Sequence, residues 1–181
     1  MLGTYAKFVP AMTLMALAGC GGGDNASSQA DATLPRLQLT SDAFRSGQPI
    51  PTQYTCDGLN QTPTLHWGDP PAGTKGFALV IDDPDAPFGT FRHWGVFDIP
   101  ASARSIGNAQ RVGTEVNNDN GTKGYTGPCP PRGMHHYQFK LFALNTERLD
   151  LPANAGVKDL ETAARQHAIA EGELVGTYAR K

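Results

Sequence analysis

Carboxylates, imidazoles and a phenol gather at three places in this sequence, each beside a run of apolar residues. The run FALVI leads into DDPDAP, residues 82–87, where two prolines restrict the directions in which Asp83 and Asp85 can point. His93 lies within the apolar run FRHWGVF. The third place is GYTGPCPPRGMHHY, residues 124–137, which is too rich in proline and glycine to continue a helix or a central strand. It ends on His135, His136 and Tyr137, directly before another apolar run.

Each of these groups also has an ordinary structural explanation. Aspartates at the end of a strand often bond to their own backbone in a turn, and a single histidine in an apolar strand is often a core residue. Successive side chains of a strand face opposite sides, so we expect His135 and Tyr137 on one face and His136 on the other. The side chain of one of the two histidines should therefore point into the space that the loop encloses.

Three chemistries could use Asp83, Asp85, His93, His135 and Tyr137. A zinc site, joined by Cys129, wants closely spaced Cys and His ligands, and neither CxxC nor HxxxH occurs. A hydrolase needs a nucleophile on a tight turn, and no GxSxG is found. The third is a pocket for a small anion, in which imidazole N–H groups and the Tyr137 hydroxyl donate hydrogen bonds. We therefore expect a binding protein without metal, cofactor or catalysis.

The elements that must position these groups are mostly short strands. Apolar patterning bounded by Gly, Pro, Asn and Asp predicts strands at Leu37–Ser41, Thr64–Trp67, Gly76–Asp82, His93–Ile99, His136–Leu144 and Glu173–Tyr178. The segment from Val157 to Ala170 has apolar residues at helical spacing and predicts one helix. The fold class is mainly β: a Greek-key sandwich with a C-terminal helix and few peripheral helices.

The first 33 residues read as targeting sequence rather than fold. Residues 1–19 hold one early cation, Lys7, and an apolar run too short to span a bilayer, which indicates a signal peptide. Leu17-Ala18-Gly19-Cys20 resembles the bacterial lipoprotein processing box, with Cys20 as the lipidated residue; an ordinary signal peptide is the alternative. Residues 20–33 then form a Gly-, Ser- and Ala-rich tether, and one domain covers 34–181. By resemblance to the enteric sorting rule, Gly21 after the cysteine favours the periplasmic face of the outer membrane.

Charge and cysteine content narrow the class further. The chain has 15 Lys and Arg against 17 Asp and Glu, and no basic cluster, so nucleic acid is not an expected partner. Cys56 and Cys129 remain once Cys20 is lipidated. In an oxidising compartment they form either a disulfide or two free thiols, and the sequence leaves that choice open.

Taken together, the motifs are similar to those of a known family. DPDAP (residues 83–87), the His93 of FRHWGVFDIP and GPCPPRGMHHY (127–137) occur in the order found in the phosphatidylethanolamine-binding protein (PEBP), or Raf-kinase-inhibitor-like, family. YTCDGLNQTPTLHW (54–67) and GELVGTY (172–178) resemble its bacterial branch. The resemblance covers nearly all of 34–181.

The resemblance implies a β-sandwich with a pocket at one end for phosphate, phosphoethanolamine or acetate-like anions. The residues that match the family's pocket are Asp83, Asp85, Pro87, His93, Gly127, Pro128, Pro131, His135 and Tyr137. In relatives a cis peptide precedes the proline that Pro87 matches. Relatives also commonly carry arginine where this chain has His136.

We therefore expect an envelope lipoprotein that binds a small phosphate- or carboxylate-bearing ligand, with a phospholipid headgroup as one candidate. The membrane is a partner through the lipid anchor. The alternative is an inhibitor or regulator of a partner protein, such as a protease or an envelope sensor, because relatives inhibit kinases or a serine carboxypeptidase. A homodimer is also expected from bacterial relatives.

Overall fold

The computed structural model describes residues 1–3 and 34–180. The predictions for the signal peptide, Cys20 and the tether fall on residues 4–33 and so lie outside the described residues. In the part that is described, no helix combines the length and the apolar character needed to cross a membrane.

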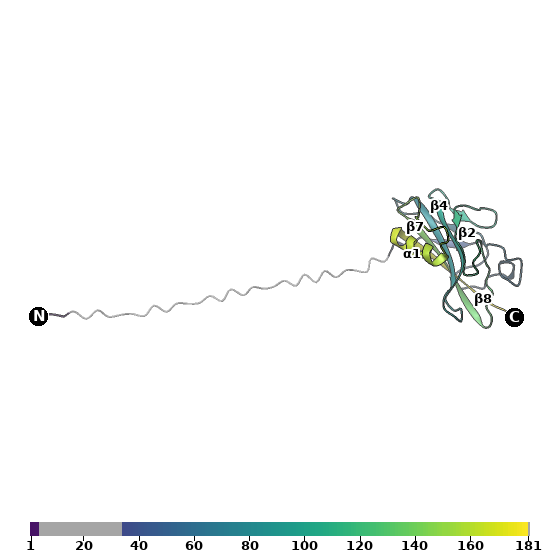
Figure 1. Cartoon of the computed structure of the whole chain (residues 1–181), viewed down its shortest axis with the longest axis horizontal. Coiled ribbons are helices and arrows are strands. Elements are labelled where there is room, and N and C mark those ends of the chain that lie inside the picture. Colours follow the sequence, from purple (N-terminus) through teal and green to yellow (C-terminus); the bar gives the residue numbers. More distant parts are fainter. Residues whose placement is uncertain (4–33, 181) are drawn as a thin grey trace. The chain divides into compact units, whose positions relative to one another are not determined.

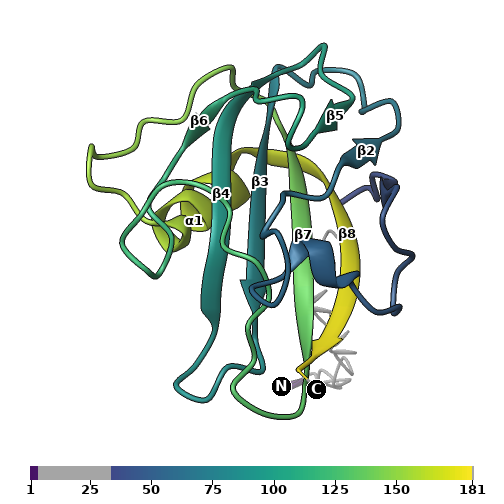
Figure 2. The ribbon, with the colours of Figure 1, turned by 90° about the vertical axis from the view of Figure 1, so that its right-hand side faces the viewer.

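Two antiparallel sheets and one α-helix make up the domain (Figures 1 and 2). The larger sheet runs in the order β6 (Thr114–Glu115), β4 (Phe91–Pro100), β3 (Gly76–Asp83), β7 (Met134–Leu144) and β8 (Ala168–Ala179). The smaller sheet contains β1 (Leu39–Ser41), β2 (Leu65–Trp67) and β5 (Ser105–Ile106). A 3-10 turn spans Thr52–Tyr54, and α1 spans Val157–His167. The prediction of a mainly β domain with a C-terminal helix is confirmed.

The central strand β3 is buried along its whole length, because both faces of the large sheet are covered. Phe77, Leu79 and Ile81 face the core shared with the small sheet. Ala78 and Val80 face the opposite way, into a second core under α1. This two-sided burial explains why FALVI is a continuous apolar run instead of an alternating one.

Helix α1 packs on the outer face of the large sheet, where Leu160 and Ala164 are fully buried. Gly95 of β4 permits this contact, since a Cβ there would lie 2.9 Å from Cγ2 of Val157 and 3.0 Å from Cδ2 of Leu160. The helix ends at His167, so the prediction that it continues to Ala170 is wrong. Residues 168–170 instead begin β8, where Ala170 pairs with Ala143 of β7 and is buried in the main core.

The predicted strands all occur, with β8 beginning five residues earlier than expected. The two-residue strands β5 and β6 were missed, since two residues are too few to show an alternating pattern. At one end of the large sheet the chain leaves β3 and enters β4 and β7: Asp83 pairs with Phe91, and Asp82 pairs with Gln138. The register therefore brings all three polar segments of the sequence to the same end of the large sheet, where β3 ends and β4 and β7 begin (Figure 2).

Candidate functional site

A buried carboxylate–histidine pair lies at the centre of this end of the sheet. Nδ1 of His135, on β7, is 2.7 Å from Oδ2 of Asp83, the last residue of β3. Both side chains are buried. The other carboxylate oxygen of Asp83 accepts the backbone N–H of Asp85 at 2.9 Å. Asp83 thus orients the imidazole and shapes the turn that follows its own strand.

A second carboxylate–histidine pair lies on the exposed side of the same strands. Oδ2 of Asp85 accepts the backbone N–H of His136 at 2.8 Å and contacts Nδ1 of that residue at 2.7 Å. These hydrogen bonds from His136 hold the pKa of Asp85 below its ordinary value. The structure therefore pairs Asp85 with His136 on the exposed side, and this pair ties the β3–β4 turn to β7. The expected alternation along β7 is present: His135 and Tyr137 are buried, and His136 is exposed.

His93 reaches the buried group from β4. Its Nδ1 lies 2.7 Å from the backbone carbonyl oxygen of Thr126, and a carbonyl can only accept, so Nδ1 carries the proton. Its Nε2 is buried and makes no hydrogen bond with any described residue. Burial lowers the pKa of His93, opposed by the Thr126 carbonyl and by the charge of Asp83.

Tyr137 completes the group. Its ring stands edge-on to His93, with the ring centroids 5.3 Å apart. Its hydroxyl is buried and, like Nε2 of His93, has no hydrogen-bond partner among the described residues. Burial, and then the charge and the nearby side chain of Asp83, raise the pKa of this phenol, opposed by the backbone of Cys129, so it remains a protonated donor at neutral pH.

The arrangement is suited to binding a polar ligand. A buried polar atom without a partner costs about 1–3 kcal/mol, and most such atoms in proteins are satisfied. Here two of the five such atoms among the described residues belong to neighbouring rings beside the Asp83–His135 pair. A ligand or a water that hydrogen-bonds to both atoms would remove this cost.

The wall loop, residues 127–131, is fastened to the segment 54–60. Cys129 is joined to Cys56 by a disulfide, with their Cα atoms 5.4 Å apart. The carbonyl of Pro128 accepts the N–H of Cys56 at 3.1 Å. The N–H of Gly127 donates to Oδ1 of Asn60 at 2.7 Å. One disulfide and two hydrogen bonds therefore fix the loop. The sequence alone did not decide between a disulfide and two free thiols.

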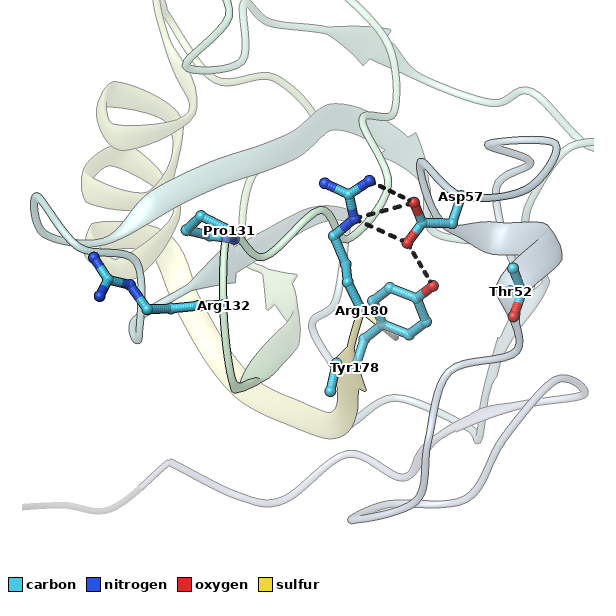
Figure 3. Close-up of a pocket in the computed structure, with 7 residues that line it drawn as sticks. Thr52, Asp57, Pro131, Arg132, Tyr178 and Arg180 are labelled. Atoms are coloured by element: carbon cyan, nitrogen blue, oxygen red, sulfur yellow. Dashed lines mark hydrogen bonds and ion pairs between the residues drawn. The ribbon is translucent and has the colours of Figure 1, made fainter.

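The two remaining predicted residues, Pro87 and Pro131, are exposed, unlike the buried group. Pro87 is exposed in the β3–β4 turn, and the peptide bond before it is trans, contrary to what the resemblance implied. Pro131 is exposed and lines a cavity of about 480 Å³ on the side of the wall loop (Figure 3).

That cavity contains residues which the sequence did not single out: Thr52, Asp57, Arg132, Tyr178, Ala179 and Arg180. Asp57 accepts from the Tyr178 hydroxyl at 2.9 Å and from Nε of Arg180 at 3.1 Å (Figure 3). These hydrogen bonds, that from Arg180 foremost, lower the pKa of Asp57. Tyr178 is also the register partner of His135 on β8, so the cavity adjoins the buried group. The CDG and TYAR segments gave no chemical signal because their roles appear only when β8 reaches the 52–58 turn.

Thr126 and Asn118 were also missed. Asn118 is buried and holds the loop that supplies the Thr126 carbonyl, since its Nδ2 donates to the carbonyl of Gly124 and to Oγ1 of Thr126, each at 3.0 Å. The cluster NNDNGTKG indicated only a turn. Within the described residues, no group of three or more His, Cys, Asp or Glu is placed to hold a metal ion.

Comparison with known proteins shows which family carries this arrangement at the end of the large sheet. The family model described as "Phosphatidylethanolamine-binding protein" matches residues 40–179, which include Asp83, His93, His135, Tyr137 and the wall loop. The chain belongs to the PEBP family.

Relatives of the chain are spread over bacteria and archaea. A UPF0098 protein of Aquifex aeolicus is 45% identical over 152 residues, covering 80% of this chain and 89% of the relative. LppC of Mycobacterium tuberculosis, which carries the word lipoprotein in its name, is 40% identical over 184 residues, covering 91% and 90%. The crystal structure of Escherichia coli YbcL, a PEBP family member, aligns with a TM-score of 0.74 and 35% identity, covering 81% of this chain and 99% of YbcL. The family resemblance predicted from the motifs is confirmed.

Proposed function

We propose that this protein is an envelope lipoprotein whose PEBP-type domain binds a small phosphate- or carboxylate-bearing ligand at the end of the large sheet where β3, β4 and β7 meet. The ligand-binding residues are His93, His135 and Tyr137, with Asp83 orienting His135. The wall loop 127–131 is part of the same site. The protein acts as a binding module, and catalysis is not part of the proposal.

One observation carries the ligand site: Nε2 of His93 and the hydroxyl of Tyr137 are both buried, both without a partner among the described residues, and on rings in edge contact. The framework around them is already built. The Asp83–His135 pair, the Thr126 carbonyl and the fastened wall loop hold the groups in place, which lowers the ordering cost of binding.

The envelope part of the proposal rests on the sequence and on one relative. The Leu-Ala-Gly-Cys box at residues 17–20 has the form of a lipoprotein processing site, and LppC carries the name of a lipoprotein. The disulfide between Cys56 and Cys129 is consistent with export, because disulfides persist mainly in oxidising compartments. Acyl chains on Cys20 would hold the protein at the periplasmic face of the outer membrane.

An NMR titration of the protein with inorganic phosphate, and separately with phosphoethanolamine, tests the ligand site. The imidazole signals of His93 and His135 should shift and saturate, while those of His66 and His167, which are exposed or half-buried elsewhere, should stay in place. Equal affinity for both probes would mean that the phosphate group alone is recognised. Tighter binding of phosphoethanolamine would indicate contacts to the amine as well.

Absence of any saturable shift at His93 and His135 would contradict the proposal. In that case the alternative, regulation of a partner protein, becomes the better hypothesis. An envelope extract passed over the immobilised protein would then be the next experiment.

A further inference from the structure

The protonation of the two site histidines is fixed by what their Nδ1 atoms contact. Nδ1 of His93 faces the carbonyl of Thr126, and Nδ1 of His135 faces the carboxylate of Asp83, both at 2.7 Å. A carbonyl or an ionised carboxylate can only accept, so each Nδ1 carries a proton. A neutral imidazole has one N–H, and therefore both Nε2 atoms present lone pairs in the neutral state.

In that state the site is a poor receptor for an anion. The lone pairs of an oxyanion would meet the lone pairs of two Nε2 atoms, and among the side chains of Asp83, His93, His135 and Tyr137 only the Tyr137 hydroxyl would donate. The carboxylate of Asp83 is buried beside these rings, and when ionised it repels an anion under weak screening. An anion ligand and this constellation are compatible only if a proton is added.

We propose that the site binds an oxyanion together with a proton, which Nε2 of His93 takes from solvent and keeps while its N–H donates a hydrogen bond to the ligand. The inference rests on the proposed function and adds that binding of the ligand is coupled to the uptake of one proton. One N–H bond forms on Nε2, the bond between that proton and hydronium or a buffer acid breaks, and the imidazolium of His93 balances one negative charge of the ligand.

The surroundings of His93 support this assignment. Burial lowers the pKa of His93 and so favours its neutral form, whereas a bound anion would supply a counter-charge for the imidazolium. The titratable and polar groups that face it come from three elements: Asp83 from β3, His135 and Tyr137 from β7, and Asp119 and the Thr126 carbonyl from the loop after β6. Asp119 is partly neutralised, since it accepts the backbone N–H of Arg92 and lies 3.8 Å from its Nη1. Phe91 covers the edge of the His93 ring and carries no charge.

A different occupant fits the neutral state. Two lone pairs and a buried carboxylate suit an ammonium group, which would bind better as pH rises. The direction of the pH dependence therefore separates an oxyanion from the amine end of a headgroup.

Calorimetric titration of the protein with sulfate tests the inference, because sulfate does not titrate between about pH 5 and about pH 8, where histidine does. The dissociation constant should rise by about tenfold per pH unit above the pKa of the responsible group. Titrations in two buffers of different ionisation enthalpy should show uptake of about one proton per sulfate.

Sulfate binding without proton uptake would overturn this inference and leave the proposed function standing. No binding of sulfate or phosphate at any pH would remove the proposed function and this inference together. Binding of ethanolamine that strengthens with pH, without sulfate binding, would likewise overturn both.

Two substitutions assign the proton to His93. His93→Gln places a non-titrating amide near the position of Nε2 and should retain sulfate binding with a flatter pH profile. His93→Asn retains a donor for the Thr126 carbonyl and lacks the second nitrogen, so its affinity should fall at least tenfold at about pH 6, where the wild type binds well. His167→Gln, at the end of α1, is the control and should keep the wild-type profile. An unchanged pH slope in His93→Gln would place the proton on another group and overturn the assignment. Circular dichroism of each variant confirms that it is folded, and the wild-type proton count does not depend on any variant.

Discussion

Nδ1 of His135 and Oδ2 of Asp83 lie 2.7 Å apart in a buried pair that joins the start of β7 to the end of β3. Two residues after Asp83 and one residue after His135, Asp85 and His136 form a second pair at the same distance, with both side chains about half exposed. Aspartate–histidine pairs thus serve two purposes at this end of the sheet. The buried pair orients the imidazole that we propose as a ligand-binding group, and the exposed pair holds the turn.

The buried pair should contribute measurably to stability. We expect Asp83→Asn to lower the free energy of unfolding by about 1.5–3 kcal/mol, the usual contribution of a hydrogen bond that involves a charged group. The matched control is Asp42→Asn, which breaks the exposed contact between Asp42 and Nε2 of His66 at 2.9 Å. Exposed pairs contribute only about 0–1 kcal/mol. Urea unfolding of both variants gives the comparison, and equal losses would contradict the distinction between the two pairs.

The close approach of Gly127 to segment 54–60 should make it intolerant of a side chain. A Cβ at this position would lie 2.5 Å from the carbonyl oxygen of Tyr54 and 2.6 Å from Oδ1 of Asn60. Gly127→Ala should therefore displace the wall loop and cost about 1–3 kcal/mol, as overpacking usually does. Gly68→Ala is the control, because its nearest contact would be Cβ of Gln38 at an ordinary 3.8 Å. Thermal unfolding of the two variants should differ clearly, and similar melting temperatures would show that the loop can move without cost.

The disulfide should stabilise both the domain and its site. It closes a loop between residues separated by 73 positions, for which the loop-closure estimate is about 4 kcal/mol. The double variant Cys56→Ala/Cys129→Ala should lose stability of that order. It should also bind sulfate more weakly, because the wall loop would then have to be ordered by the ligand. Weaker binding with unchanged stability would mean that the bond acts on the loop alone.

Much of the fold could be predicted because its apolar pattern is strong. The run FALVI marks β3, and the helical spacing after Val157 marks α1. The end of α1 could not be predicted, since residues 168–170 suit a helix locally and are strand only through their ladder with β7. This is a tertiary contact overriding local preference.

The site was predictable in its residues and less so in their pairing. Alternation along β7 correctly separated His135 from His136. It gave no means of telling which aspartate meets which histidine, because that depends on the register between β3 and β7 and on the turn after Asp83. The Thr126 carbonyl that fixes the tautomer of His93 is a backbone group, so no side-chain pattern could reveal it.

Lipid attachment at Cys20 is a prediction of its own. Cys20→Ser should abolish metabolic labelling with palmitate and release the protein from the membrane fraction, because the acyl chains would be its anchor. Sedimentation of membranes followed by immunoblotting measures the release. Cys56→Ala/Cys129→Ala serves as the control and should remain membrane-bound. Persistence of Cys20→Ser in the membrane fraction would contradict the lipoprotein assignment.

The low pKa of His93 should make the free protein less stable in mild acid. The unfolded state, in which histidine titrates near pH 6.5, binds a proton before the folded state does, since burial disfavours the imidazolium. The contribution of His93 to stability is therefore full above about pH 6.5 and is lost as pH falls below it, by up to about 1.4 kcal/mol per pH unit. Urea unfolding of wild type and His93→Gln between about pH 8 and about pH 5 isolates this contribution, because glutamine does not titrate and all other histidines are shared. The stability of the wild type relative to His93→Gln should fall over that range, and saturating sulfate should weaken or reverse the trend. A difference that stays constant with pH would show that the burial of His93 does not disfavour its charged form.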